Sequence, residues 1–301
     1  MKLQRKITGW LVVGVTFLSA FLIVAAIVLI MSDVILGGKD LISWEFLTGV
    51  PTEGMTAGGI FPAIIGTVLL VLIMSIVGVP IGTITAVYLS EYASRKSILT
   101  RLVRFAVNTL AGVPSIVFGL FGLGFFIQFV GTGMDNILTG GVELHWGQPN
   151  ILWASLTMAL LTLPVVIVSV EETIRSVPKD LREASLALGA TKWQTIYKVV
   201  LPNSLNGIFT GTILAVGRGA GEVAPILFTG VAYYLPHLPG SLSDQFMNLG
   251  YHVYVMATQS HDVEATLGIQ YATTLVLLVL TFTLTFAAMF LRYKIRKRAI
   301  H

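Results

Sequence analysis

Long apolar runs separated by short polar segments dominate the pattern of this 301-residue chain. A helix that crosses the hydrocarbon core of a bilayer needs about 20 mostly apolar residues. Five runs reach this length without an internal charge: residues 7–31, 60–89, 105–130, 151–170 and 269–291. A sixth run, residues 204–231, qualifies if Arg218 and Glu222 are accepted inside the span. The pattern therefore predicts an all-α, polytopic membrane protein with six transmembrane helices.

The first apolar run follows a basic stretch, residues 1–6, and so has the polarity of a secretory signal. Its apolar core is longer than the roughly 7–15 residues of a signal peptide, and no small-x-small cleavage site follows it. We interpret this run as a retained membrane anchor. Residues 1–58 are then expected to form this helix and an external loop, and residues 59–301 a core domain with a long loop at residues 171–202.

Composition supports a membrane protein as well. Apolar residues make up 55% of the chain and charged residues 11%, and the mean hydropathy is +0.84. A soluble domain carries about a quarter charged residues, so this chain cannot cover itself with a solvated surface. The absence of cysteine excludes disulfides, thiolate metal sites and cysteine nucleophiles. We expect no metal and no cofactor.

Basic residues are concentrated on one side of the predicted spans. Three precede the first span, four lie between the second and third, five lie between the fourth and fifth, and five follow the sixth. The three opposite loops contain one basic residue, Lys39, and most of the acidic residues. Because cytoplasmic loops are enriched in Lys and Arg, both termini are predicted to be cytoplasmic. The sequence pI of about 9.3 reflects this asymmetry and does not indicate a nucleic-acid partner.

The loop at residues 171–202 carries signals for two short helices. Pro178 precedes the first, over residues 179–188, and Gly189 supplies the left-handed residue that commonly ends a helix. Thr191 begins the second, and Gln194 three residues later completes the spacing of a capping box. Pro202 is predicted to end it before the next span begins. These signals alone leave two interpretations: an amphipathic hairpin lying on lipid headgroups, or a rigid projection that inserts into a soluble partner.

The sequence of this loop resembles a known motif. Glu183-Ala184-Ser185, then Gly189 after three residues, then Val199-Val200-Leu201-Pro202 after nine more, are similar to the EAA loop of binding-protein-dependent ABC importer permeases, EAA-x3-G-x9-I-x-L-P. Ser185 and Val199 depart conservatively from that pattern. The resemblance implies a coupling-helix hairpin that sits in a groove of a cytoplasmic ATPase, with these coupling residues: Glu183, Ala184, Gly189, Leu201 and Pro202.

Longer strings resemble one branch of these permeases. Residues 58–67, 88–92, 111–122, 182–194 and 217–230 together look like the PstA-type permease subunits of phosphate importers, and the resemblance covers about residues 1–295. It implies the type I ABC importer permease fold and the inner membrane of a prokaryote as its location. It also implies inorganic phosphate as substrate and three partners besides membrane lipid: a second, PstC-type permease, a PstB-type ATPase dimer and an external PstS-type phosphate-binding protein. The binding protein would deliver its substrate on the side of residues 233–261.

Arg218 and Glu222 are the only charges deep inside a predicted span. Each costs about 2.5–3.5 kcal/mol at a helix centre on insertion scales. At i and i+4 of one helix they share a face, with Thr229 close to it. Either the pair is structural and holds the fifth helix in place, or Arg218, Glu222 and Thr229 line the path of an anion. The resemblance favours the second interpretation, although Val223 replaces a threonine of the common family form Arg-Ala-x-Gly-Glu-Thr. Glycines at 217, 219 and 221, followed by Pro225, also predict a local break in this helix.

Other classes of protein fit the sequence less well. A membrane hydrolase built on Ser115 would need a general base, yet all five histidines fall in external loops or the tail. A passive anion channel has no use for a capped cytoplasmic hairpin. No Gly-x4-Gly-Lys-Ser/Thr loop is present, so ATP hydrolysis is assigned to partner subunits. Small-residue clusters are predicted to pack helices together: Gly78, Gly82, Gly119, Gly122 and Gly124.

Overall fold

Helices form nearly all of the regular structure. The computed structural model describes residues 2–52, 55, 57–94, 96–260 and 262–299, so Glu53, Arg95 and His261 lie outside it. The first half contains α1 (Lys2–Gly38), η1 (Lys39–Leu41), α2 (Trp44–Thr48), β1 (Pro51–Thr52), β2 (Ala57–Gly58), α3 (Phe61–Val87), η3 (Tyr88–Tyr92), α4 (Ile98–Leu110), α5 (Ser115–Phe121), η4 (Gly122–Gly131) and α6 (Thr132–Leu138). The second half contains α7 (Ile151–Ser176), α8 (Lys179–Ala187), α9 (Lys192–Thr195), η5 (Ile196–Val200), α10 (Leu201–Gly221), α11 (Leu249–Thr258) and α12 (Val263–Ala299). The short strands β1 and β2 pair antiparallel, and η3, η4 and η5 are π-helical.

Six helical segments are long and apolar enough to cross a membrane, as predicted. They span Gly9–Leu41, Phe61–Tyr92, Ser115–Leu138, Ile151–Ser176, Lys192–Gly221 and Val263–Lys294. Burial differs sharply among them: 67% of the most apolar window of α7 is buried, but none of that of α1 or α12. The all-α, six-span prediction is therefore confirmed, and α7 forms the centre of the bundle. The division of the chain at residue 58 stays a prediction.

Small residues let α3 and α10 approach α7 closely. A Cβ on Gly82 would lie 2.7 Å from Val166 Cγ1, and a Cβ on Gly211 would lie 3.2 Å from Val166 Cα. Gly78 faces Ala159 in the same interface. Without a hydrophobic drive between helices in lipid, such close backbone contact supplies much of the association energy. The predicted packing role of the glycines at 78 and 82 is confirmed.

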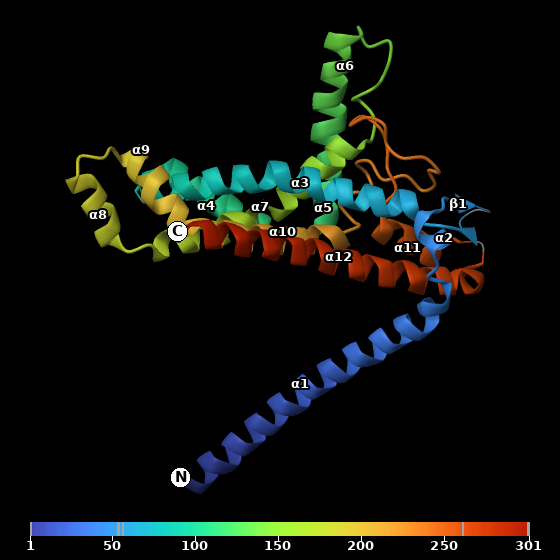
Figure 1. Cartoon of the computed structure of the whole chain (residues 1–301), viewed down its shortest axis with the longest axis horizontal. Helices are drawn as coiled ribbons and strands as arrows, with labels where there is room; N and C mark the ends of the chain where they lie inside the picture. Colours follow the sequence, from blue (N-terminus) through green and yellow to red (C-terminus); the bar gives the residue numbers. More distant parts are fainter. Residues whose placement is uncertain (1, 53–54, 56, 95, 261, 300–301) are drawn as a thin grey trace.

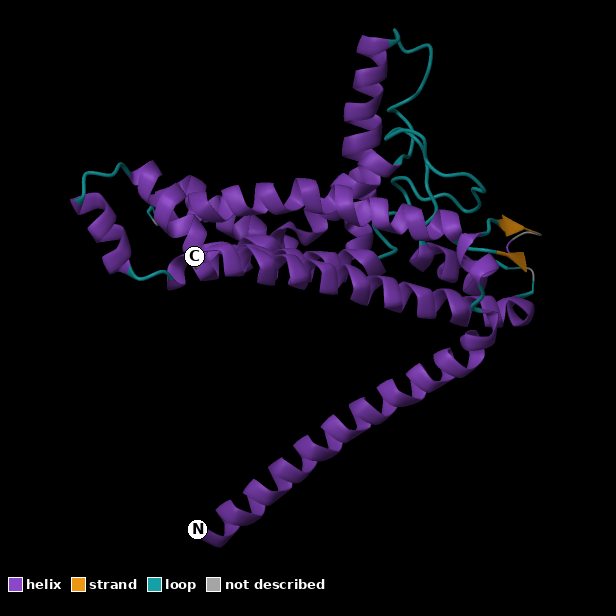
Figure 2. Cartoon of the chain, in the orientation of Figure 1, coloured by secondary structure: helices purple, strands orange, loops and turns teal. Residues whose placement is uncertain are grey.

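The bundle has two distinct ends (Figure 1). The hairpin of α8 and α9 lies at one end, together with the last turns of α12, whereas the first residues of α1 lie well away from the bundle. The strands, α2 and α11 lie at the opposite end, as Figure 2 shows for the strands. Helix α1 diverges from the bundle, and α6 stands out from its side, which leaves both with exposed apolar surfaces. Below, the two ends are called the hairpin end and the opposite end.

The third predicted span, residues 105–130, is wrong in its limits. Helix α4 ends at Leu110, and a separate helix begins at Ser115 and continues to Leu138. Pro114 separates them, with an extended ψ of 138°, and it disfavours helical backbone at the residue before it. The apolar run conceals this break because residues on both sides are hydrophobic.

The fifth predicted span also needs correction. Helix α10 ends at Gly221, and Glu222 is extended with ψ of 135°, so residues 222–231 are not part of the helix. The predicted break near Pro225 is real, but it falls at the glycine before Glu222. Pro202 does not end the preceding helix: the helical rod runs unbroken from Lys192 to Gly221. The π-helical turn η5 precedes Pro202, which then occupies the first turn of α10, where its missing N–H is tolerated.

Candidate functional site

The charged pair lies at the point where α10 stops. Arg218 is in the last turn of the helix, and its Nε donates to Glu222 Oε1 at 3.3 Å. The two side chains are 42% and 23% exposed in the isolated chain. A guanidinium near a helix C-terminus interacts favourably with the negative end of the helix dipole. Since a charge facing lipid is costly, this exposed pair must lie against a water-filled path or a partner subunit.

Thr229 does not share the face of Arg218. Its side chain is fully buried, and its hydroxyl donates to Pro225 O at 3.0 Å. The methyl group of Thr229 packs against Gly122 of η4, where an added Cβ would lie 2.6 Å away. The end of the helix at Gly221 therefore places Thr229 in the packing between η4, α7 and the segment that follows α10. The structure brings Arg218 and Glu222 together but separates Thr229 from solvent.

A cavity of about 410 Å³ follows the same side of α10 toward the hairpin end. Its lining includes Thr210 and Leu214 of α10, together with residues of α4 and α7. Thr210, Leu214 and Arg218 are spaced four residues apart, so each lies about 6 Å further along the helix on a slowly turning face. The polar lining residues are Asn108, Ser169, Glu172 and Thr210. The cavity was not predicted, because α4 was assigned to a membrane span.

One further cation lies beside this cavity. Arg292 of α12 donates from Nη1 to Thr210 Oγ1 at 3.5 Å. The hydroxyls of Thr210 and Ser169 donate to the carbonyls of Asn206 and Gly207, at 2.7 and 3.1 Å. The Asn108 side chain belongs to the lining of the cavity, and the Arg292 guanidinium lies next to it on Thr210.

The hairpin has the local structure that its sequence predicts. Helix α8 ends in a Schellman motif: Gly189 has φ of +85°, its N–H donates to Leu186 O at 3.0 Å, and Ala190 N–H donates to Ser185 O at 3.2 Å. Thr191 and Gln194 form the predicted capping box of α9. The Ser185 and Thr195 hydroxyls, 2.9 Å apart, join the two helices.

The hairpin exposes large apolar side chains among its charged ones. Leu188 is 89% exposed, and Trp193 and Tyr197 stack with ring centroids 6.3 Å apart while both remain exposed. Of the predicted coupling residues, Glu183, Ala184, Gly189 and Pro202 are exposed and Leu201 is half-buried. An exposed apolar surface on a rigid, capped support is typical of a docking site.

Two clusters of arginine–carboxylate contacts at the hairpin end were not predicted. Arg182 of α8 binds Glu91 of η3 at 2.9 Å. Glu171 of α7 accepts from Arg104 of α4 at 2.7 Å and from Arg175, four residues further along the same helix, at 2.6 Å. Glu91 and Arg104 are distant in sequence from their partners, so no local signal identified those two pairs.

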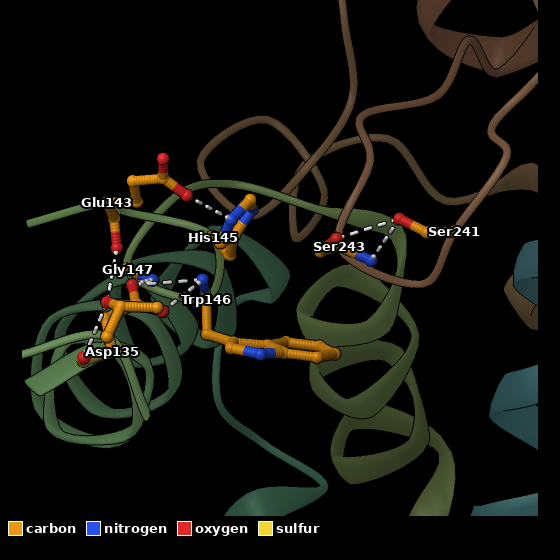
Figure 3. A network of polar contacts seen from close by, with 8 residues as sticks. Asp135, Glu143, His145, Trp146, Gly147, Ser241 and Ser243 are labelled. Atoms are coloured by element: carbon orange, nitrogen blue, oxygen red, sulfur yellow. Dashed lines mark hydrogen bonds and ion pairs between the residues drawn. The ribbon is translucent and has the colours of Figure 1, made fainter. Parts of the chain in front are cut away.

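The loops at the opposite end are held by carboxylates that accept backbone N–H groups. Asp135 is buried and accepts from Trp146 and Gly147, at 3.0 and 2.6 Å (Figure 3). In the neighbouring loop Asp244 accepts from the Ser241 hydroxyl and from Gly240 N–H, both at 2.8 Å. These bonds, first that from Ser241, lower the pKa of Asp244. The opposite end is therefore a preformed surface.

The fold defines a class of protein. The structure of this chain is similar to that of one chain in the "Crystal structure of bacterial alginate ABC transporter in complex with alginate pentasaccharide-bound periplasmic protein". The TM-score is 0.66, the sequence identity is 16%, and 96% of each chain is covered. At this identity the likeness establishes the fold alone. Six spans with a capped hairpin between the fourth and fifth are the fold of an ABC importer permease subunit.

Sequence relatives narrow the assignment. Residues 78–300 match the family described as "Binding-protein-dependent transport system inner membrane component". "Probable ABC transporter permease protein YqgI" of Bacillus subtilis is 36% identical over 227 residues, 75% of this chain and 72% of that protein. "Phosphate transport system permease protein PstA" of Mycobacterium leprae is 36% identical over 232 residues, 75% of this chain and 70% of that protein.

The chain belongs to the binding-protein-dependent transport system inner membrane component family. It is a multi-pass inner-membrane protein and a transport component that works with the other subunits of an ABC importer. The predicted fold and class are thereby confirmed.

Proposed function

We propose that this chain is the PstA-type permease subunit that moves inorganic phosphate inward across the membrane. The observation that carries the proposal is the exposed Arg218–Glu222 pair at the end of a membrane-spanning helix. The similarity to permeases named for phosphate transport supports the choice of substrate. A guanidinium presents a planar fork of donors that matches phosphate oxygens and stays charged at any physiological pH.

The surroundings of Arg218 favour weak, transient binding of an anion over tight binding. Glu222 offsets part of its charge, and the helix C-terminus adds a negative dipole end that disfavours a bound anion. Attraction is therefore weak, and weak binding at several places lets an ion leave again. The cavity beside Asn108 and Arg292 extends this path toward the hairpin end.

Glu222 supplies selectivity in this proposal. At neutral pH phosphate retains at least one proton, whereas sulfate retains none. A carboxylate accepts hydrogen bonds and donates none. Glu222 can therefore accept a hydrogen bond from the protonated oxygen of phosphate, whereas it repels a fully ionised anion. Arg218 attracts both oxyanions and Glu222 repels sulfate, so the pair discriminates between phosphate and sulfate.

The hairpin is the proposed contact with the ATPase. Its exposed Leu188, Trp193 and Tyr197 would enter a groove of one subunit of a PstB-type ATPase dimer, around Glu183, Ala184 and Gly189. A PstC-type permease would complete the path, and a PstS-type phosphate-binding protein would dock on the opposite end. With the hairpin end rich in Lys and Arg, both termini lie in the cytoplasm in this proposal.

The test uses the complete complex in vesicles, with phosphate uptake measured in the presence and absence of sulfate. A variant complex that works without the binding protein removes selection outside the membrane. Glu222→Gln keeps the shape and adds an amide donor, so we expect sulfate to begin to compete. Arg218→Ala should nearly abolish uptake, because it removes the attraction and leaves Glu222 unpaired. Lower uptake in Glu222→Gln with unchanged oxyanion preference would favour a purely structural Arg218–Glu222 pair.

A further inference from the structure

Arg182 is the most fully bonded arginine at the hairpin end. Its Nε and Nη2 donate to Glu91 Oε1 at 3.2 and 2.9 Å, Nη2 also donates to Ile174 O at 2.7 Å, and Nη1 donates to Val177 O at 2.5 Å. The Arg182 and Glu91 side chains are 20% and 12% exposed. Charge-assisted bonds in a partly desolvated place are stronger than surface ion pairs.

The position of this pair in the fold is unusual. The hairpin is joined through the chain to α7 on one side and to α10 on the other, but α3 has no such connection. Leu89 of η3 shares an apolar cluster with Ile174 and Val200, and among the described residues two polar contacts also link the hairpin to η3, the last turn of α3. They are the Arg182–Glu91 pair and Lys192, whose Nζ lies 4.8 Å from the centroid of the Tyr92 ring.

Helix α3 also touches α10 beside the charged pair. A Cβ on Gly219 would lie 2.6 Å from Met74 Sδ, so α3 packs directly against the residue that follows Arg218. Close packing transmits small displacements because an interior cannot be compressed. A shift of α3 relative to α10 therefore changes the surroundings of Arg218.

We propose that the Arg182–Glu91 pair is the polar link through which the hairpin itself moves α3. When the ATPase displaces the hairpin, α7 and α10 follow through the chain. Helix α3 follows through its packing against α7 and, at the hairpin, through this pair. The Arg182 bonds to Ile174 and Val177 hold the hairpin on α7, and its bonds to Glu91 extend that hold to α3. Arg182 and Glu91 are positioning residues that act on the anion path through α3.

Glu91→Gln is the clean perturbation. It removes the charge that binds Arg182 but leaves the guanidinium on the carbonyls of Ile174 and Val177, so the hairpin keeps its attachment to α7. A carboxylate at the C-terminal end of α3 is also unfavourable to the helix dipole, so its loss does not weaken α3 by itself. Arg175→Gln is the matched control: it breaks an arginine–carboxylate contact at the same end, and Glu171 keeps Arg104.

The measurement is the number of phosphate ions transported per ATP hydrolysed by the reconstituted complex. We expect Glu91→Gln to assemble with the ATPase and hydrolyse ATP at close to the wild-type rate, with a transport ratio about tenfold lower, equivalent to about 1.4 kcal/mol of coupling. Arg175→Gln should keep the wild-type ratio. In a double-mutant cycle, Arg182→Gln should lower the ratio less in the Glu91→Gln background than in the wild type, because only its bonds to Ile174 and Val177 then remain to be lost.

Two results would overturn the proposal. One is a wild-type transport ratio in Glu91→Gln, and the other is an equal loss in Arg175→Gln. The proposal rests on the transport function proposed above, but the two can fail separately. If the wild-type complex carries no phosphate, the substrate assignment fails. The link is then judged by whether Glu91→Gln loses the stimulation of ATP hydrolysis that the external binding protein produces in the wild-type complex.

Discussion

The corner at Gly189 allows a prediction in which backbone strain is separated from side-chain size. Gly189 has φ of +85°, and no atom lies within 4 Å of the position that a Cβ would occupy. Any substitution therefore finds room, and its cost comes from the backbone alone. An L-residue in the left-handed region costs about 1–2 kcal/mol, and a β-branched residue is worse. Gly189→Val should therefore cost about 2 kcal/mol, which lowers the equilibrium constant between the correctly folded corner and its alternatives about 30-fold.

A series of substitutions makes the test sharp. Asn tolerates the left-handed region better than Ala, although its side chain is larger. If strain is the cause, transport per ATP in reconstituted complexes should fall in the order Gly, Asn, Ala, Val, with membrane insertion unchanged. Co-purification of the ATPase should fall in the same order if docking needs the intact corner. An order that follows side-chain volume would refute the reasoning and indicate a steric contact with the partner, and normal transport in Gly189→Val would remove the role of the hairpin.

Two further predictions concern the membrane-embedded packing and the opposite end. Gly122→Val should lower the free energy of unfolding by about 1–3 kcal/mol, because the new side chain would overlap Thr157 and Thr229. Gly124→Ala should leave the free energy of unfolding unchanged, because the space around Gly124 is open. Burial lowers the pKa of His252 from 6.5 to about 4. As the pH falls from 6.5 to 4, His252 therefore becomes protonated in the unfolded chain but stays neutral in the folded chain. Stability should be fully present above pH about 6.5 and decline by about 3 kcal/mol toward pH 4, and His252→Leu should flatten this dependence in thermal unfolding.

Much of the fold is predictable because its signals are local or strong. Each span is long enough to be recognised from hydropathy alone, although two of the six had wrong limits. The Schellman glycine and the capping box at Thr191 each require only a few neighbouring residues, and both are present as predicted. Signals of this kind depend on local backbone geometry and not on the tertiary packing.

The candidate site was harder to predict because helix periodicity was extended past a break. Spacing of i and i+4 suits a contact inside a helix, and Arg218 and Glu222 do make that contact, but with Glu222 in extended backbone. Beyond Gly221 the 100° step no longer applies. Thr229 was therefore assigned to the wrong surface, and only the irregular backbone after Gly221 explains why it packs against Gly122.

The division of α4 from α5 has a similar cause and a larger consequence. Gly112 and Pro114 interrupt an apolar run without lowering its hydropathy, so the sequence conceals an amphipathic helix that carries Arg101 and Arg104. Once α4 is separate, Asn108 lies on the wall of the cavity, and Arg104 reaches Glu171 of α7. A single misplaced boundary thus conceals both the cavity and one of the two ion-pair clusters at the hairpin end.

The Arg182–Glu91 pair shows a limit of a different kind. The two residues are 91 positions apart, and each has an adequate local explanation: Glu91 is a polar residue in the turn η3, next to the cytoplasmic loop expected from the sequence, and Arg182 is a good helix former in α8. Neither the sequence around Glu91 nor that around Arg182 indicates that the two residues form a pair. Their meeting follows from the packing of α3 against α7, which the glycines at 78 and 82 permit. Small residues buried in the bundle therefore determine which charges meet at its surface. A sequence pattern can identify these small residues without revealing which charged residues they bring together.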